Sequence, residues 1–92
     1  MAKGQKFEEK VAEYMHGQHI GGPGEPDYKR GSVDGEVKDW DKRMGRSAVM
    51  NEVQKGRDEI VSREGFTDEA ISYRDQYRPK VKLVDWTTKK QV

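Results

Sequence analysis

Residues 26–40 read PDYKRGSVDGEVKDW, and we predict that they form a β-hairpin beginning at Asp27. Gly31-Ser32 is a turn signal between two short extended segments. Because side chains alternate between the two faces of a strand, Glu36 and Lys38 are expected on one face, and the residue between them on the other. The hairpin returns Asp27 to the neighbourhood of Glu36. We therefore expect two carboxylates and one ammonium group to share one patch of a sheet.

Such a patch has a defined chemistry. Two neighbouring carboxylates are hard oxygen ligands of the kind that Mg²⁺ accepts while it keeps several waters. A lysine beside them can orient a metal-bound water and offset the charge on a phosphate under attack. A solvated polar hairpin with an exposed ion pair is the alternative interpretation of the same residues.

The four residues Pro26, Asp27, Glu36 and Lys38 resemble the motif of the PD-(D/E)xK nuclease superfamily, the fold of many restriction enzymes, junction resolvases and nuclease toxins. The resemblance implies a restriction endonuclease-like core. It implies catalytic roles for Asp27, Glu36 and Lys38, with Lys38 positioning the attacking water. It also implies Mg²⁺ or Mn²⁺ as cofactor, held by both carboxylates and by the backbone carbonyl of Val37.

The segment from Gly4 to about Gln18 is predicted to be an amphipathic helix. Its apolar residues share one stripe at helical spacing, namely Phe7, Val11, Tyr14 and Met15. Glu8 lies at the edge of this stripe, whereas Glu9 lies on the opposite face. In many members of the superfamily a glutamate of the first helix joins the metal cluster, so Glu8 is the expected accessory residue. A solvated helix carboxylate is the alternative for Glu8.

Four further segments follow the hairpin. We predict a long helix from Ser47 to Glu64, because Val49, Met50, Val53, Ile60 and Val61 form an apolar face. A short helix from about Asp68 to Arg78 is expected after a Thr67 cap. Lys80 to Trp86 alternates as a strand that is apolar on both faces, which is typical of a sheet covered by helices on both sides. Residues 87–92 are predicted to be a frayed tail.

The fold class that follows is α/β (α+β): one domain over residues 1–92, with a small mixed β-sheet and helices on both faces. The resemblance implies a strand between the first helix and Pro26, and only His19-Ile20 can supply it, so the sheet is expected to be abbreviated. Only 15 of the 92 residues are Leu, Ile, Val or Phe, which predicts a modest core.

Charge and cysteine content limit the classes of function. The 18 basic and 17 acidic residues nearly cancel, so nucleic-acid binding must come from local basic clusters. The absence of cysteine excludes disulfides and thiolate metal sites and fits a cytoplasmic location, or delivery into a cytoplasm if the chain belongs to a toxin. No apolar run is long enough for a membrane span, and we expect no membrane partner.

The expected nucleic-acid contacts lie in the hairpin, in the loop after it and in the long helix. They are Lys29, Arg30, Lys42, Arg43, Arg46 and Arg57. Arg57 has a second interpretation, since it lies in the apolar face of the predicted helix and can point into the charged site. Gln54 is carried over from the resemblance as a second accessory residue. Trp40 can stack on a base or serve as a core aromatic.

These residues lead us to expect a metal-dependent endonuclease that hydrolyses phosphodiester bonds of DNA in preference to RNA. A non-catalytic nucleic-acid- or protein-binding module on the same fold is the alternative, with Asp27, Glu36 and Lys38 as an ion-pair cluster. A homodimer is the expected assembly on a duplex. An inhibitor or immunity protein is the expected partner if the chain is a toxin module.

Overall fold

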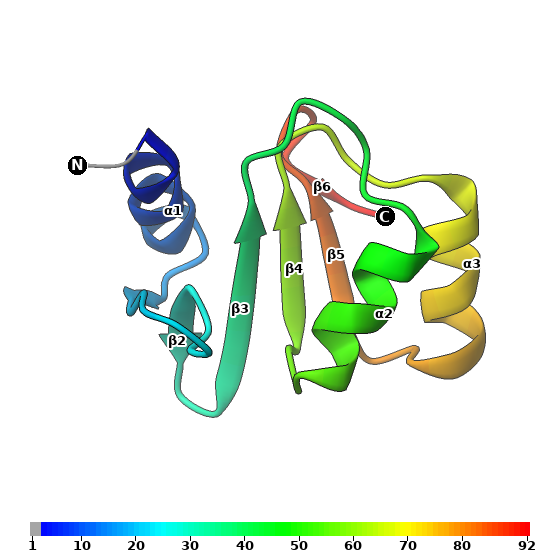
Figure 1. Ribbon diagram of the computed structural model, residues 1–92, viewed down its shortest axis with the longest axis horizontal. Coiled ribbons are helices and arrows are strands. Elements are labelled where there is room, and N and C mark those ends of the chain that lie inside the picture. The colour runs from blue at the N-terminus through cyan, green and yellow to red at the C-terminus, as the bar shows by residue number, and fades with distance from the viewer. Residues whose placement is uncertain (1–2) are drawn as a thin grey trace.

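The computed structural model describes the backbone of residues 3–92 and the side chains from residue 6 onward. These residues form three helices and one six-stranded sheet (Figure 1). In chain order the elements are α1 (Lys3–Tyr14), β1 (Gln18–His19), β2 (Tyr28–Arg30), β3 (Val33–Lys38), α2 (Arg46–Gln54), β4 (Glu59–Ser62), α3 (Asp68–Tyr77), β5 (Lys82–Asp85) and β6 (Lys90–Gln91).

The strands lie in the sheet in the order in which they occur along the chain. β1, β2 and β3 form an antiparallel meander, β3, β4 and β5 are parallel, and β6 returns antiparallel to β5. Figure 1 shows the arrows of β3, β4 and β5 pointing the same way, with their following loops at one edge of the sheet. The predicted mixed sheet is confirmed.

Two small cores lie on opposite faces of this sheet. On one face, α1 contributes Val11 and Ala12 to a cluster with strand residues such as Val61. On the other face, α2 and α3 pack against Ile60 and Leu83. Ile60 and Val61 are neighbours in β4, so this strand supplies both cores through the alternation of its side chains. Helices cover both faces, as predicted.

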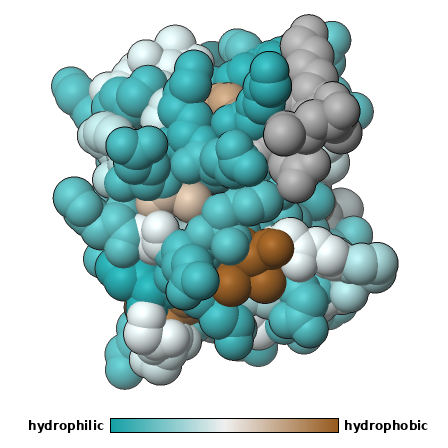
Figure 2. Space-filling view, turned by 90° about the vertical axis from the view of Figure 1, so that its left-hand side faces the viewer, coloured by the Kyte–Doolittle hydropathy of each residue, from teal (hydrophilic) through white to brown (hydrophobic). Residues whose placement is uncertain are grey.

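The surface is correspondingly polar. Figure 2, which looks onto the side of the molecule where α1 and β2 lie in Figure 1, is mostly hydrophilic and shows hydrophobic colour only in small patches. The exposed large hydrophobic residues of the described chain are Tyr14, Ile20, Tyr77 and Val92. This distribution agrees with a sequence that has few apolar residues to bury.

The predicted helix from Ser47 to Glu64 is wrong in its second half. α2 ends at Gln54, and Glu59–Ser62 is the central strand β4, with all four residues buried. Gly56 follows the helix with a φ of 89°, a left-handed conformation that ends helices and suits glycine. A buried parallel strand is apolar on both faces, so its short run of residues matches a helical stripe equally well.

The ends of the chain also differ from the prediction. The first helix ends at Tyr14 rather than near Gln18. The strand before Pro26 is Gln18–His19, which pairs with β2 and begins one residue earlier than the expected His19-Ile20. Residues 87–92, predicted to fray, instead turn back and form β6, and the Val92 N–H donates to the Leu83 carbonyl at 2.9 Å. Backbone pairing to a buried strand is what orders this end.

The third helix agrees closely with the sequence. α3 begins after Thr67, whose Oγ1 accepts a hydrogen bond from the Ala70 N–H at 3.2 Å. β5 (Lys82–Asp85) lies within the predicted strand and places Leu83 and Val84 in opposite cores. Both features are set by local signals, a capping side chain and strict alternation.

Gly35→Ala is expected to destabilise the protein by about 1–3 kcal/mol. A Cβ at residue 35 would lie 2.0 Å from Cζ of Tyr28, whose ring is fully buried. Tyr28 cannot move aside easily, because its hydroxyl donates to Oε1 of buried Glu59 at 2.6 Å. Urea denaturation measures the effect. Gly45→Ser is the control, because a Cβ at residue 45 meets nothing within 4 Å, and the stability of this variant should be unchanged or higher. An equal loss of stability in both variants would contradict the close contact between residue 35 and Tyr28.

Candidate functional site

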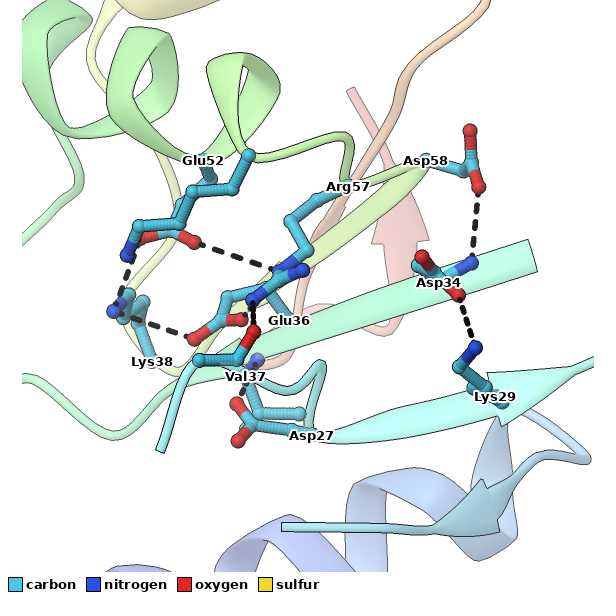
Figure 3. Close-up of polar contacts among 11 residues, drawn as sticks. Asp27, Lys29, Asp34, Glu36, Val37, Lys38, Glu52, Arg57 and Asp58 are labelled. Carbon is cyan, nitrogen blue, oxygen red and sulfur yellow. Dashed lines mark hydrogen bonds and ion pairs between the residues drawn. The ribbon is translucent and has the colours of Figure 1, made fainter. Parts of the chain in front are cut away.

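The predicted catalytic residues meet on the face of the sheet that carries α2 (Figure 3). Asp27 lies directly before β2, and Glu36 and Lys38 lie in β3. The Lys38 Nζ is 3.4 Å from Oε2 of Glu36, whereas Val37 packs into the α1-side core. Alternation along β3 therefore places Glu36 and Lys38 on one face of the sheet and Val37 on the other, as expected.

Asp27 is held against the second strand of the hairpin. Its backbone N–H donates to the Gly35 carbonyl at 2.9 Å, and its Oδ2 accepts from the Val37 N–H at 2.8 Å. This contact places the Asp27 carboxylate beside Glu36. The Val37 backbone thus reaches Asp27 through its N–H, and metal ligation by its carbonyl stays a prediction.

The pKa values of both carboxylates are raised. For Asp27 the main cause is burial, which the Val37 N–H opposes and the charge of Glu8 reinforces. For Glu36 the pKa is raised first by burial and then by the negative charges of Asp27 and Glu52. Carboxylates that burial and like charge destabilise in this way are a common property of functional sites.

Four side chains form a closed ring in which the sign of the charge alternates, and they are Glu36, Arg57, Glu52 and Lys38. The Arg57 Nε donates to Oε1 of Glu36 at 3.0 Å and lies 3.9 Å from Oε1 of Glu52. The Lys38 Nζ lies 3.2 Å from the Glu52 carboxylate and closes the ring (Figure 3). Burial alone would lower the pKa of Lys38, but the Glu52 and Glu36 carboxylates raise it, so Lys38 carries a positive charge.

Glu52 is the site residue that the sequence interpretation missed. It comes from α2, is 3% exposed and points to Lys38, whereas the predicted accessory residue Gln54 is exposed at the end of the helix. The sequence does hold a signal, because Glu52 lies between Val49 and Val53 on the apolar face of α2. A carboxylate on a buried face requires a partner, and here the partners are Lys38 and Arg57.

Arg57 and Glu8 border the site from other segments. Arg57 lies between α2 and β4 and is 6% exposed, so it points into the charged site rather than outward to a phosphate. It also donates to the Gly24 carbonyl of the glycine-rich loop at 3.4 Å. Oε1 of Glu8 is 3.2 Å from Nε2 of His19, and its charge acts on Asp27. The structure therefore brings Arg57 into the charged site, whereas the side-chain contact of Glu8 is with His19.

The basic residues of the hairpin lie on opposite faces. Lys29 is exposed on the site face, 3.5 Å from Oδ1 of Asp34. Arg30 is on the α1 face, where it pairs with buried Glu59. The burial of Glu59 makes Arg30 part of a structural charge network, and of the two residues only Lys29 is exposed on the site face.

The remaining basic residues lie between β3 and α2. Lys42 and Arg43 are exposed in this loop, and Arg46 is the first residue of α2. The Arg46 guanidinium carbon lies 5.7 Å from the centre of the Tyr73 ring, on the α3 side. Of the three, Lys42 is close to the site through Trp40, whose ring centre is 5.7 Å from the Lys42 Nζ.

No family model, curated protein or solved structure matches the chain. Function is therefore inferred from the site itself. Each helix in residues 3–92 is too short or too polar to cross a bilayer. Within the same residues, no group of three or more His, Cys, Asp and Glu side chains is arranged to hold a metal. The available ligands are Asp27 and Glu36, a hard-oxygen pair with raised pKa values that suits a cation retaining several waters.

The raised pKa values lead to a prediction about pH. The folded protein binds the carboxyl protons of Asp27 and Glu36 more tightly than the unfolded chain does. The free energy of unfolding should therefore fall as the pH rises from the ordinary pKa values, 3.8 for Asp27 and 4.5 for Glu36, through the raised pKa values of the folded protein. Asp27→Asn should therefore raise the free energy of unfolding at pH 7, by up to about 1 kcal/mol because solvent screens this partly exposed group. Urea denaturation at pH 7 and at pH 4 measures the change, which should shrink at pH 4.

Asp34→Asn is the matched control. Asp34 lies on the same strand face and pairs with exposed Lys29, so its replacement should leave stability unchanged or slightly lower at pH 7. Equal destabilisation by Asp27→Asn at both pH values would show that the hydrogen bond from Val37 outweighs the repulsion.

Proposed function

We propose that this protein is a metal-dependent nuclease that hydrolyses phosphodiester bonds of DNA in preference to RNA. The observation that carries the proposal is the meeting of Asp27, Glu36 and Lys38 on one face of the hairpin, with both carboxylates destabilised by burial and by like charge. Such an arrangement does not stabilise the fold, whereas a bound cation would offset the repulsion between the two carboxylates.

Each residue has a role that follows from its position. Asp27 and Glu36 would hold Mg²⁺ or Mn²⁺, which supplies Lewis-acid activation of water and of the phosphate when bound. Lys38, kept charged by Glu36 and Glu52, orients the attacking water and offsets the negative charge that develops on the phosphate. Glu8 is an accessory acid beside Asp27, and Gln54 is an accessory residue at the edge of the site.

The architecture supports the resemblance that suggested this function. The superfamily core is a helix, a sheet, a helix and a strand, and the chain has α1, the β1–β3 meander, α2 and β4 in this order. A two-residue strand, β1, precedes the motif and shares His19 with the expected segment His19-Ile20. This order of elements supports the proposed nuclease function.

The test is cleavage of plasmid DNA, branched DNA and total RNA with Mn²⁺, beside calorimetric titration of the metal. We expect Asp27→Asn to weaken metal binding at least tenfold and to reduce cleavage below about one hundredth of the wild-type rate. Asp34→Asn, which removes a carboxylate from the same face of the sheet, should keep both metal binding and cleavage. Undiminished cleavage by Asp27→Asn would overturn the assignment of the site.

A specific observation also favours the non-catalytic module. The ring of Glu36, Arg57, Glu52 and Lys38 already pairs opposite charges without a metal. In this case the cluster is structural, and the fold presents a nucleic-acid- or protein-binding surface. Metal titration separates the two functions: binding that depends on Asp27 and Glu36 supports the nuclease, and no binding at millimolar Mg²⁺ or Mn²⁺ supports the module.

A further inference from the structure

Trp40 lies between two hollows next to the candidate site. The first has a volume of about 530 Å³, lies between the end of β3 and α2, and is lined by residues that include Lys38, Trp40, Asn51, Gln54 and Lys55. The second, of about 460 Å³, is lined by Asp39, Trp40, Asp41, Lys42 and Arg63. Both volumes are within the range of small-ligand sites.

Two ammonium groups lie over the Trp40 ring in cation–π contacts, so a base that stacks on the ring must move one of these flexible side chains aside. The Lys38 Nζ lies 5.5 Å and the Lys42 Nζ 5.7 Å from the centre of the Trp40 ring. Lys38 lines the first hollow and Lys42 the second. Lys42 forms no ion pair with any described residue, so its charge remains available to a phosphate.

The ring itself is partly buried and packs against the α2-side core. The indole is thus held by the core, and it also lines both hollows, where a ligand can reach it. Asn51 and Gln54 add amide groups to the first hollow, and an amide can donate to or accept from the edge of a base.

We propose that Trp40 is the stacking platform for one unpaired base of a single-stranded nucleic acid, with Lys38 and Lys42 beside the backbone phosphates. The proposal builds on the proposed nuclease function and gives it a substrate class. A base stacked on Trp40 places its neighbouring phosphate near Lys38, which also contacts Glu36. Paired bases in a duplex have no free face for the ring, so single strands, flaps or unpaired ends fit this site better than intact duplex.

The test measures binding without cleavage, in EDTA. Trp86→Phe leaves Trp40 as the only tryptophan, and its fluorescence is titrated with a short single-stranded oligothymidylate. We expect quenching of Trp40, and about ten- to a hundred-fold weaker binding by an oligonucleotide of the same length whose bases are replaced by abasic sites. The same sequence as a duplex should bind more weakly than the single strand. Equal binding by the abasic strand, or binding without quenching, would overturn the stacking role.

Variants provide a second measurement. Trp40→Ala should remove the difference between normal and abasic strands, provided that circular dichroism shows it folded. Lys42→Ala, which leaves the core unchanged, should weaken binding several-fold and reduce the salt dependence by about one phosphate contact. Lys80→Ala, another exposed lysine, should change neither. Unaltered binding and salt dependence in Lys42→Ala would place the strand elsewhere.

The outcomes distinguish this inference from the nuclease function. Base-dependent quenching with no cleavage in Mn²⁺ would retain the Trp40 site and remove the nuclease. Cleavage that depends on Asp27, with no base-dependent binding, would retain the nuclease and remove the Trp40 site.

Discussion

Arg57→Ala is expected to lower the free energy of unfolding by about 3–5 kcal/mol. Arg57 is 6% exposed and Glu36 is 8% exposed, so the variant leaves a buried carboxylate without its main donor. Glu52 also loses a neighbouring positive charge, and its Oε1 has no hydrogen-bond partner in the described chain. A loss of this size is a large part of the 5–15 kcal/mol that stabilises a typical domain.

Urea denaturation at pH 7 measures this change. Lys55→Ala is the matched control, because Lys55 also contacts Glu52, at 3.5 Å, but its side chain is 56% exposed. We expect a change below about 0.5 kcal/mol there. The double variant Arg57→Met with Glu36→Gln should regain part of the loss, since it removes the unpaired charge. Similar values for Arg57→Ala and Lys55→Ala would mean that the ring is as weak as a surface ion pair.

Lys38→Ala is expected to reduce cleavage by about 10²–10³-fold. Lys38 is the one ammonium that contacts both Glu36 and Glu52, and no other described lysine contacts Glu36. Because the carboxylates Asp27 and Glu36 remain, metal binding should be kept. The combination of lost cleavage and retained metal binding separates a role toward water and phosphate from a role in holding the cofactor.

The measurement pairs single-turnover cleavage in Mn²⁺ with calorimetric metal titration. Lys80→Ala is the control, since it removes the positive charge of an exposed lysine that lines neither hollow, and cleavage should stay within a few-fold of wild type. Wild-type rates in Lys38→Ala would eliminate the proposed mechanism. Loss of both metal binding and cleavage would instead mean that Lys38 is needed to hold the carboxylates of the site in place.

The hairpin could be predicted from the sequence because its signals are local. Gly31 takes a φ of 62° at the turn, and alternation along β3 places Glu36 and Lys38 on one face. The same logic holds for α3, where Thr67 caps the helix. In these segments a few consecutive residues determine both the backbone and the direction of the side chains.

β4 could not be predicted in this way. Its pattern fits a helical stripe, and its strand conformation is stabilised by hydrogen bonds to β3 and β5, which are distant in sequence. The charge network on the α1 face depends on the same pairing, because Tyr28 and Arg30 reach Glu59 only when β2, β3 and β4 lie side by side. Burial raises the pKa of Tyr28, and its hydrogen bond to Glu59 adds to this.

Local signals in the sequence are enough to predict the hairpin, the capped helix α3, the strand β5 with apolar residues on both faces and the patch that joins Glu36 to Lys38. Each follows from turn chemistry, capping or alternation within one segment. The packing of segments that are distant in sequence places Glu52 beside Lys38 and turns Arg57 inward to Glu36. The same packing adds the last residues to the sheet as its edge strand β6. These outcomes depend on which segments pack together, since burial determines whether a charged side chain meets water or a partner of opposite charge.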